Sequence, residues 1–454
     1  MTDRRERLTT DSGTVVLVGA GLGGSLMAIL LGRAGYRVRC FEMRPDPRAG
    51  SPRVGRSINL AISARAIHAL GTIGLAKDVL AVGIPMRGRM IHDLNGRTVF
   101  QPYGTVAEHA NYSVSRAELN IALLNAAAAL PNVEFRFGMK CAGVDPEAGI
   151  VTFAEPGDSQ PESGRRETAV GDVIIGADGA FSTVRQQIQR QDRFDYQQSF
   201  LSHGYKELTL PPGDGGGFAL DRNALHIWPR GGFMMIALPN RDGSFTCTLF
   251  WPLEGANSFA ALRTGEEVRR FFTGVFPDAA RLMPDLEAEY IRNPVGSLVT
   301  VRCSPWRYGA RVVLLGDACH AVVPFHGQGA NAAFEDCVVL DECIRSLAPD
   351  WSRVFSSFEA LRRENTDALA DLSIANFEEM RDHAGSRAFR LKKGLEKGLH
   401  RLFPSWFIPL YMMISFTRIP YAAAVRRARR QARVVAAIAG AAFLFILMML
   451  YRSL

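Results

Sequence analysis

Apolar residues occur in short runs that glycine-rich and polar turns separate, and the first run is a predicted buried strand at 14–18 (TVVLV). Glycines follow it, and then an apolar helix is predicted through Gly32. A second strand is predicted at 36–41, and it ends at Glu42. This order of strand, helix and strand is typical of a dinucleotide-binding unit.

The middle of the chain alternates between helical and strand patterns. Ser115 and Glu118 have the spacing of a capping box, which predicts a helix from there to Leu130. The further predicted elements are a strand at 133–137, a hairpin excursion at 141–171 with a polar tip at 155–168, and a buried strand at 173–175.

The pattern changes from about 195 to 305, where short segments rich in Phe, Thr, Trp and Met alternate with turns. These segments predict a mostly antiparallel sheet, inserted into the first domain. The strand at 311–315 (RVVLL) returns the chain to that domain, and a helical pattern runs from 329 to about 430.

The last part of the chain contains an unbroken apolar stretch at 434–451. As a helix it is roughly 27 Å long, close to the thickness of a hydrocarbon core. Five arginines between 426 and 433 precede it, whereas only Arg452 follows it. This asymmetry predicts a membrane anchor whose N-terminal body faces the cytoplasm. The alternative is a buried or dimer-forming helix. Residues 1–13 lack the apolar segment of a secretory signal.

The charge distribution supports a membrane surface as the partner. The formal net charge is +8, but residues 418–454 hold seven arginines and no acidic residue, so the rest of the chain is close to neutral. A basic tail beside an apolar run favours lipid over nucleic acid. The seven cysteines are odd in number and show no CxxC spacing, which indicates reduced thiols and no metal site.

Gly19-Ala20-Gly21-Leu22-Gly23-Gly24 fits GxGxxG between the first strand and its helix. In such a motif Gly19 permits the tight turn, Gly21 lets the backbone approach a pyrophosphate, and Gly24 lets helix and strand pack closely. The helix N-terminus then offers unpaired N–H groups to phosphates. Glu42, about 20 residues further on, can accept hydrogen bonds from a ribose diol. Together these features predict dinucleotide binding.

Two Gly/Asp turns follow buried strands later in the chain. Gly176-Ala177-Asp178-Gly179 follows the strand at 173–175, and Gly316-Asp317 follows the strand at 311–315. Each could be a plain turn. The loop Pro324-Phe325-His326-Gly327-Gln328-Gly329-Ala330-Asn331 precedes a helix, so its N–H groups could lie against a flavin ring. We interpret His326 as a neutral loop histidine, with a catalytic base as the alternative.

The order of these motifs resembles the single-component FAD-dependent aromatic hydroxylases with the p-hydroxybenzoate hydroxylase fold. Further segments are similar to the kynurenine 3-monooxygenase family from about residue 14 to the tail. They are GRSINLA (55–61), GIPMRGRMIHDLNG (83–96), SVSRAELN (113–120), HGYKELTLPP (203–212), LHIWPRGGFMMIALPN (225–240), SFTCTLFWP (244–252), FEDC (334–337) and FIPLYMMISFTRI (407–419).

The resemblance implies FAD as cofactor and NADPH as co-substrate, the latter without a Rossmann domain of its own. It places FAD against Gly19, Gly21, Gly23, Gly24, Glu42, Arg44, Ala61, Arg116, Cys141, Asp178, Asp317, Gly329, Ala330 and Asn331, with Pro324, Phe325, His326, Gly327 and Gln328 around the flavin ring. For Arg116, which belongs to the family's SxSRxxL segment, the alternative is a surface arginine.

The resemblance also implies where the substrate binds. An amino-acid substrate needs a cation for its carboxylate, which arginine binds bidentately. The family pattern assigns this role to Arg89, with Tyr103, Asn376, Tyr411, Glu379 and Met380 around it. The alternatives are core aromatics for both tyrosines and a surface position for Asn376. Arg87 is interpreted as a surface residue.

The implied reaction is hydroxylation of L-kynurenine to 3-hydroxy-L-kynurenine with NADPH and O₂ through a C4a-hydroperoxyflavin, whose chemistry belongs to the cofactor. One alternative is another hydroxylase of this fold, acting on a phenolic precursor of a membrane quinone. A second is a non-catalytic flavoprotein fold used as a membrane scaffold, which predicts loss of flavin motifs that are intact here.

The expected fold is therefore α/β, with a Rossmann-type FAD-binding domain, an inserted antiparallel substrate domain, a helical C-terminal region and a transmembrane helix. The FAD-binding domain is expected at 1–85, 111–192 and 306–345, the substrate domain at 86–110 and 193–305, the helical region at 346–430 and the anchor at 431–454. The sequence leaves the oligomeric state open.

Overall fold

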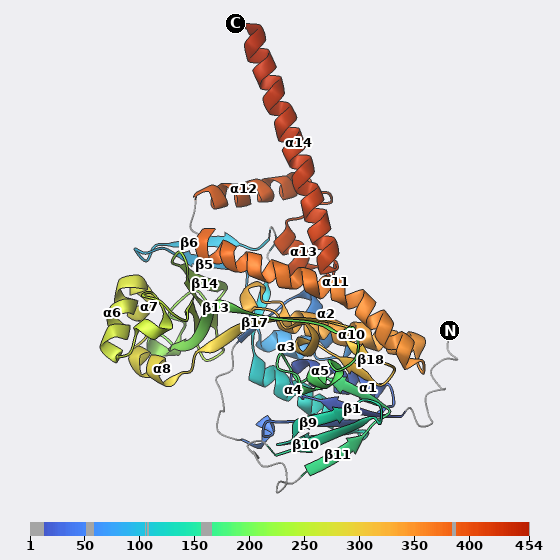
Figure 1. Cartoon of the computed structure of the whole chain (residues 1–454). Coiled ribbons are helices and arrows are strands. Elements are labelled where there is room, and N and C mark those ends of the chain that lie inside the picture. The colour runs from blue at the N-terminus through green and yellow to red at the C-terminus, as the bar shows by residue number, and fades with distance from the viewer. Residues whose placement is uncertain are drawn as a thin grey trace.

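The computed structural model describes residues 13–50, 59–104, 106, 109–155, 166–383 and 387–453, except for the side chains of 382–393 and 453 (Figure 1). Residues 1–12 and 55–58 lie outside the described residues, as does most of the polar tip expected at 155–168.

A six-stranded sheet in the order β18-β19-β12-β1-β2-β8 contains the predicted N-terminal unit. All its pairs are parallel except β18–β19. Its inner strands are nearly continuous runs of Val, Ile and Leu because they are buried: α1 packs against β1, β2 and β8, and α4 packs against β8. The elements are β1 (Thr14–Val18), α1 (Leu22–Arg33), β2 (Arg37–Glu42), α4 (Arg116–Ala128), β8 (Val133–Phe137), β12 (Val173–Gly176), β18 (Arg307–Tyr308), β19 (Val312–Leu314) and α10 (Gly329–Leu347).

A seven-stranded sheet in the order β17-β13-β16-β15-β14-β5-β6 forms a second body. Its neighbours pair antiparallel except β14 and β5, which are parallel. A buried cluster that contains Trp228, Trp251 and Phe272 joins one face to α6–α8. The elements are β5 (Gly88–His92), β6 (Thr98–Pro102), β13 (Asp195–Leu210), β14 (Ala224–Pro229), β15 (Met234–Pro239), β16 (Phe245–Pro252), β17 (Gly296–Ser304), α6 (Gly265–Val275), α7 (Pro277–Ala280) and α8 (Leu286–Arg292).

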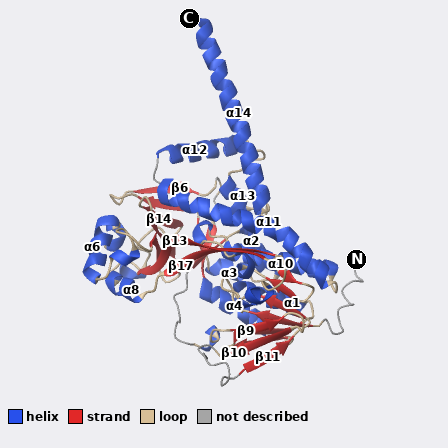
Figure 2. Cartoon of the chain, in the orientation of Figure 1, coloured by secondary structure: helices blue, strands red, loops and turns tan. Residues whose placement is uncertain are grey.

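Smaller elements complete the two bodies. Two three-stranded sheets have the orders β3-β7-β4 and β11-β10-β9, and Figure 2 shows β9–β11 on the side away from α14. The bounds are η1 (Pro47–Ala49), β3 (Asn59–Ile62), α2 (Ala64–Thr72), α3 (Ala76–Val82), β4 (Ile84–Met86), β7 (Asn111–Ser115), β9 (Lys140–Asp145), β10 (Ile150–Ala154), β11 (Arg166–Val170), α5 (Thr183–Ile188), η2 (Asp214–Gly216), η3 (Phe259–Ala261), α9 (Asp317–His320) and η4 (Pro324–His326).

The C-terminal helices lie across both bodies. They are α11 (Trp351–Glu378) with a π-helical turn (Glu379–His383), α12 (Arg387–Leu402), α13 (Leu410–Phe416) and α14 (Tyr421–Ser453). One continuous helix thus includes the boundary expected at 430/431. Tyr421–Arg452 is long and apolar enough to cross a membrane, and none of its most apolar window is buried. Figure 1 shows α14 projecting from the body.

A buried ionic network joins α2, α10 and α11. Arg65 Nε lies 3.2 Å from Glu335 Oε2, and Arg362 contacts both Glu335 and Asp336 at 2.6 Å. His320 Nε2 lies 2.5 Å from Asp336 Oδ2. Burial acts to raise the pKa of Asp336, but His320 and Arg362 lower it overall. Arg65 also donates to two backbone carbonyls of the α13–α14 region, so the root of α14 is fixed to the core.

A second buried network joins the seven-stranded sheet to α7. His92 Nδ1 lies 2.6 Å from Asp278 Oδ2, and His92 Nε2 lies 2.8 Å from His226 Nδ1. His226 Nε2 donates to the carbonyl oxygen of Asp221 at 2.8 Å. Burial lowers the pKa of His226 to about 4.

Candidate functional site

The sheet order brings the glycine motifs together. The strands β19, β12, β1 and β2 are consecutive, and each motif follows the carboxyl end of its strand. Backbone bonds connect these ends: Gly19 N donates to Phe41 O at 2.7 Å and Ala177 N donates to Val18 O at 2.8 Å. Ligands of parallel α/β sheets bind at this edge.

The glycines of the first turn have distinct structural roles. Gly19 has φ +102°, and an added Cβ would lie 2.5 Å from the carbonyl oxygen of Ala177. A Cβ on Gly24 would lie 1.9 Å from the Gly19 oxygen, whereas one on Gly21 would meet nothing within 4 Å. Gly23 faces Ala333 at 3.7 Å. Gly19 and Gly24 are therefore needed by the fold, while Gly21 faces open space in which a phosphate fits.

Glu42 lies beside this turn. Its carboxylate accepts from Ala20 N at 2.9 Å and from Arg44 N at 3.0 Å, and the Arg44 side chain is exposed. These bonds fix the carboxylate next to the glycines, which is where an adenosine ribose would need an acceptor.

Asp178 and Cys141 form the neighbouring part of the site. Asp178 Oδ2 accepts from Thr183 N at 2.7 Å and Val184 N at 3.2 Å, while its Oδ1 is buried with no hydrogen-bond partner among the described residues. Burial raises the pKa of Asp178. Burial, and then the Asp178 charge, raise the pKa of the Cys141 thiol to about 12, so it stays protonated. The free Asp178 oxygen fits a cofactor hydroxyl.

The loop from η4 into α10 is held by side chains of the core. After Pro324, Phe325 and His326, Gly327 has φ +65° and α10 begins at Gly329. Asn331 Nδ2 donates to the carbonyl oxygens of Ala61 at 3.0 Å and Gly327 at 2.8 Å. The Asn331 side chain is fully buried, so it shapes the loop, and Ala330 lies beside it in the first turn of α10.

Gln328 connects this loop to the root of α14. The Tyr421 hydroxyl donates to Gln328 Oε1 at 3.0 Å, and Gln328 Nε2 donates to Ser63 Oγ at 3.3 Å. Both Gln328 and Tyr421 are buried. Sequence reasoning missed this contact because nothing local relates positions 328 and 421.

Asp317 and Arg116 are both at the first position of a helix. Asp317 follows Gly316, whose φ is +62°. Arg116 is exposed at the start of α4, where Ser115 Oγ accepts from Glu118 N at 3.3 Å. Only this half of the expected capping box is formed among the described residues, and the Glu118 carboxylate lies 3.9 Å from Arg241.

A cavity of about 330 Å³ lies beside the loop and contains most of the expected substrate residues. Arg89 (β5), Tyr103 (after β6) and Tyr411 (α13) line it together. The Tyr103 and Tyr411 rings stack with centroids 4.9 Å apart, and His326 stacks on Tyr411 at 5.8 Å. The remaining lining residues are Val99, Phe100, Gln101, Pro102, Gly104, Leu372, Ala375, Asn376, Glu379, Gly394, Glu396, Lys397, His400, Pro409, Leu410 and Met412.

Arg89 is the buried cation of this cavity. Its side-chain Cζ lies 5.0 Å from the Tyr411 ring centroid and 6.0 Å from that of Tyr103. Burial acts to lower the pKa of Arg89, but the two phenols and Glu379 raise it overall. Arg89 Nε has no hydrogen-bond partner among the described residues. A buried guanidinium with a free N–H is suited to a carboxylate ligand.

Asn376 and Met380 contact the flavin loop and the core around it. Asn376 Nδ2 donates to the Phe325 carbonyl at 2.6 Å and lies 3.2 Å from Met380 Sδ. Met380 is 2% exposed and packs with Phe325 and Phe377, so it lies behind the cavity instead of among its lining residues. Met380 belongs to the π-helical turn at Glu379–His383, and its part in the substrate site stays a prediction.

The cavity also has an outer wall that sequence reasoning missed. Glu396, Lys397 and His400 of α12 line it, with Leu372 and Ala375 of α11. The only available signal was the amphipathic pattern of α12, which does not show what the helix covers.

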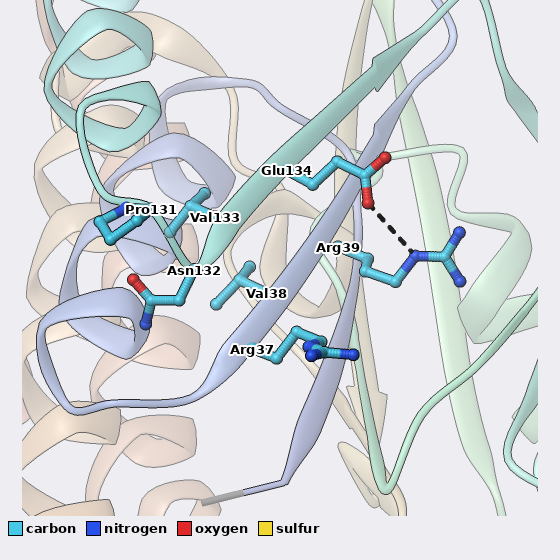
Figure 3. Close-up of a pocket in the computed structure, with 7 residues that line it drawn as sticks. All are labelled: Arg37, Val38, Arg39, Pro131, Asn132, Val133 and Glu134. Atoms are coloured by element: carbon cyan, nitrogen blue, oxygen red, sulfur yellow. Dashed lines mark ion pairs between the residues drawn. The ribbon is translucent and has the colours of Figure 1, made fainter. Parts of the chain in front are cut away.

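A second cavity of about 350 Å³ lies at the opposite end of the parallel strands (Figure 3). Arg37 and Arg39 of β2 and Glu134 of β8 line it, and Arg39 pairs with Glu134 at 3.7 Å. Because it lies at the amino ends of β2 and β8, it is separate from the glycine turns.

Comparisons with known proteins show the family to which the chain belongs. The FAD binding domain family matches residues 12–348. Kynurenine 3-monooxygenase of Salinispora tropica is 50% identical over 96% of this chain and 93% of that protein. The enzymes of Myxococcus xanthus and Sus scrofa are 48% and 44% identical, over 90% and 93% of this chain and 87% and 88% of those proteins.

Solved structures show the same fold. The tetrameric form of 2-methyl-3-hydroxypyridine-5-carboxylic acid oxygenase has a TM-score of 0.66 at 20% identity, covering 86% of this chain and 98% of that one. The tetracycline destructase Tet(51) has a TM-score of 0.61 at 18% identity, over 89% and 99%.

Proposed function

The chain belongs to the kynurenine 3-monooxygenase family, and from this we infer that it is an FAD-dependent monooxygenase that converts L-kynurenine to 3-hydroxy-L-kynurenine with NADPH and O₂. The observation that carries the substrate assignment is the buried Arg89, which lies beside two stacked tyrosine rings in a cavity next to the flavin loop.

The residues at the carboxyl edge of the parallel sheet fit FAD. Gly21 leaves space for the pyrophosphate, Glu42 provides a ribose acceptor, and Asp178 has a free buried oxygen. Asp317 lies on the adjacent strand end. When bound, FAD accepts hydride from NADPH and activates O₂ for insertion into the aromatic ring.

The protein's part is to bind and orient the aromatic substrate and to exclude water. Arg89 binds the substrate carboxylate, and Tyr103 and Tyr411 fix the guanidinium by their rings. Asn376 orients the flavin loop through the Phe325 carbonyl. Burial raises the pKa of Tyr103 well above its usual range, so its phenol remains a hydrogen-bond donor.

The chain divides into segments that bind the cofactor and segments that form the substrate sheet. We assign FAD binding to residues 1–85, 111–192 and 306–345 and the substrate sheet to 86–110 and 193–305, because β5 pairs with β14 and β6 pairs with β5, so both join the sheet of the later segment. We assign α14 to a membrane span with the body on the cytoplasmic side, because its apolar window is exposed and its arginines precede it.

Truncation tests the placement of the C-terminal helices. A chain that ends at Pro404 lacks Tyr411 and Tyr421, so it should lose turnover. A chain that ends at Arg430 keeps both and should be active but released from membranes. Activity of the shorter chain would contradict this placement.

The experiment that tests the function uses the purified full chain in detergent. NADPH oxidation is followed with and without L-kynurenine, and the product is identified by mass. A stimulated rate with a product one oxygen heavier supports the assignment. Bound FAD without stimulation contradicts it, and the phenolic precursor of a membrane quinone is then the next substrate to test.

A further inference from the structure

Helix α12 has two unlike faces. Glu396, Lys397 and His400 point to the substrate cavity and line it. Leu395 and Leu402 are 59% and 72% exposed. They are seven residues apart, or about two turns, and therefore lie on one side of the helix. A helix that covers a cavity with polar residues and shows leucines outward has an unpartnered apolar face.

The exposed apolar surface continues beyond the end of α12. Phe403 is 54% exposed and Trp406 is 42% exposed. We call Leu395, Leu402, Phe403 and Trp406 the interfacial patch. Aromatic and aliphatic side chains grouped in this way mark a surface that contacts a protein or a membrane.

Contacts with α14 determine the depth of this patch relative to the proposed span. Gln431 Nε2 donates to the Trp406 carbonyl at 2.6 Å, and Arg427 donates to the Ser405 carbonyl at 2.9 Å. Gln431 is three residues before the apolar stretch begins at Val434, which is about 4.5 Å along a helix. Trp406 thus lies where the headgroups meet the hydrocarbon if α14 crosses a bilayer, and tryptophan is enriched at that level.

Charge and orientation favour lipid as the occupant. The sequence of α12 contains six Lys and Arg residues and one acid, and anionic headgroups attract such helices. Figure 1 shows α12 running sideways from α14. A helix with this orientation lies along the surface of a membrane that α14 crosses.

We propose that the interfacial patch rests on an anionic lipid surface and that the opposite face of α12 is thereby held over the substrate cavity. The inference depends on the proposed membrane role of α14. Its consequence is that lipid limits access of water to the cavity, and water would divert NADPH oxidation to hydrogen peroxide.

The first test measures tryptophan emission of the full-length holoenzyme in vesicles of phosphatidylcholine and phosphatidylglycerol, with lipids brominated near the headgroup. Trp228, Trp251 and Trp306 are almost fully buried, and Trp351 packs on Tyr36 of the body at the start of α11, so Trp406 should account for the lipid-dependent quenching. We expect that quenching to be lost in Trp406→Phe.

Flotation tests the membrane role of α14, whereas quenching tests the contact of the interfacial patch with lipid. If the wild-type chain does not float with the vesicles, the membrane role of α14 is refuted, and the inference with it. If the chain floats but wild type and Trp406→Phe are quenched equally, only the inference is refuted. Pairing of two chains through the patch, seen as a doubled mass in detergent that Phe403→Glu abolishes, would also overturn it.

The second test measures coupling in the same vesicles. Leu402→Glu with Phe403→Glu should increase the share of NADPH oxidation that yields peroxide, while in detergent the variant should match the wild type. Ile291→Glu is the matched control, because Ile291 is 56% exposed on α8, far from α12. Unchanged coupling of the patch variant in vesicles would contradict the role of lipid in closing the cavity.

Discussion

Replacement of Arg89 by lysine tests the substrate site most directly. Lysine keeps the positive charge but loses the planar fork that binds a carboxylate at two points. It also loses the cation–π contacts of the guanidinium with the Tyr103 and Tyr411 rings. Removing one partner of a buried charge pair costs about 2–5 kcal/mol of binding free energy. Arg89→Lys only weakens the pair with the carboxylate, so we expect a loss in the lower part of that range, about 2–3 kcal/mol. We therefore expect the KM for L-kynurenine to rise about 30- to 150-fold.

The assay compares kynurenine with its analogue that lacks the carboxylate, using steady-state NADPH oxidation and product analysis. The wild type should strongly prefer kynurenine, and Arg89→Lys should lose most of this preference because the analogue never used the arginine. Arg87→Lys is the matched control, since Arg87 is exposed two residues away. If Arg89→Lys retains the full preference for the carboxylate, the assigned role of Arg89 is wrong.

Three further predictions concern stability and the cofactor. Gly21→Ala should leave the melting temperature of the apoprotein unchanged but weaken FAD binding in a titration, whereas Gly24→Ala should destabilise the apoprotein, because its Cβ would lie 1.9 Å from a carbonyl oxygen. Burial acts to raise the pKa of Asp278, but hydrogen bonds from His92 and a tryptophan lower it to about 2. The ionised Asp278 therefore contributes about 2 kcal/mol to the free energy of unfolding above pH 4, and this contribution is lost as the pH falls towards 2. Asp278→Asn should remove this pH dependence from acid unfolding. Tyr421→Phe removes one hydrogen bond to the flavin loop, so it should lower the free energy of unfolding by about 1 kcal/mol and weaken FAD retention. Flotation with vesicles should not change. Unchanged FAD retention would show that this contact does not support the cofactor site.

Much of the cofactor site could be predicted from the sequence because its signals are local. The strand at Thr14–Val18, the glycine turn and Glu42 occur within one short segment, and the structure forms that strand, that turn and the second strand as expected. The resemblance to the kynurenine 3-monooxygenase family, carried by dense sequence segments, is confirmed by relatives at 44–50% identity. The roles of individual cofactor residues stay predictions.

The substrate cavity could be predicted only through family resemblance. No local pattern relates Arg89 to Asn376 or Tyr411, which come from β5, α11 and α13. The parallel pairing of β5 with β14 places Arg89, and the packing of α13 against α14 places Tyr411. The π-helical turn at Glu379–His383, which contains Met380, was not predicted, since such a turn leaves no clear mark in sequence.

The sequence by itself determined the elements whose cause lies within a few residues: buried strands from apolar runs, glycine turns from conformational and steric need, and an apolar helix from length and composition. The tertiary structure alone decided which of these elements meet. The sheet order β19-β12-β1-β2 gathers the glycine motifs, and α12 covers the cavity with one face while its leucines point outward. Such contacts depend on burial shared between distant segments, so no single stretch of the chain contains enough information to specify them.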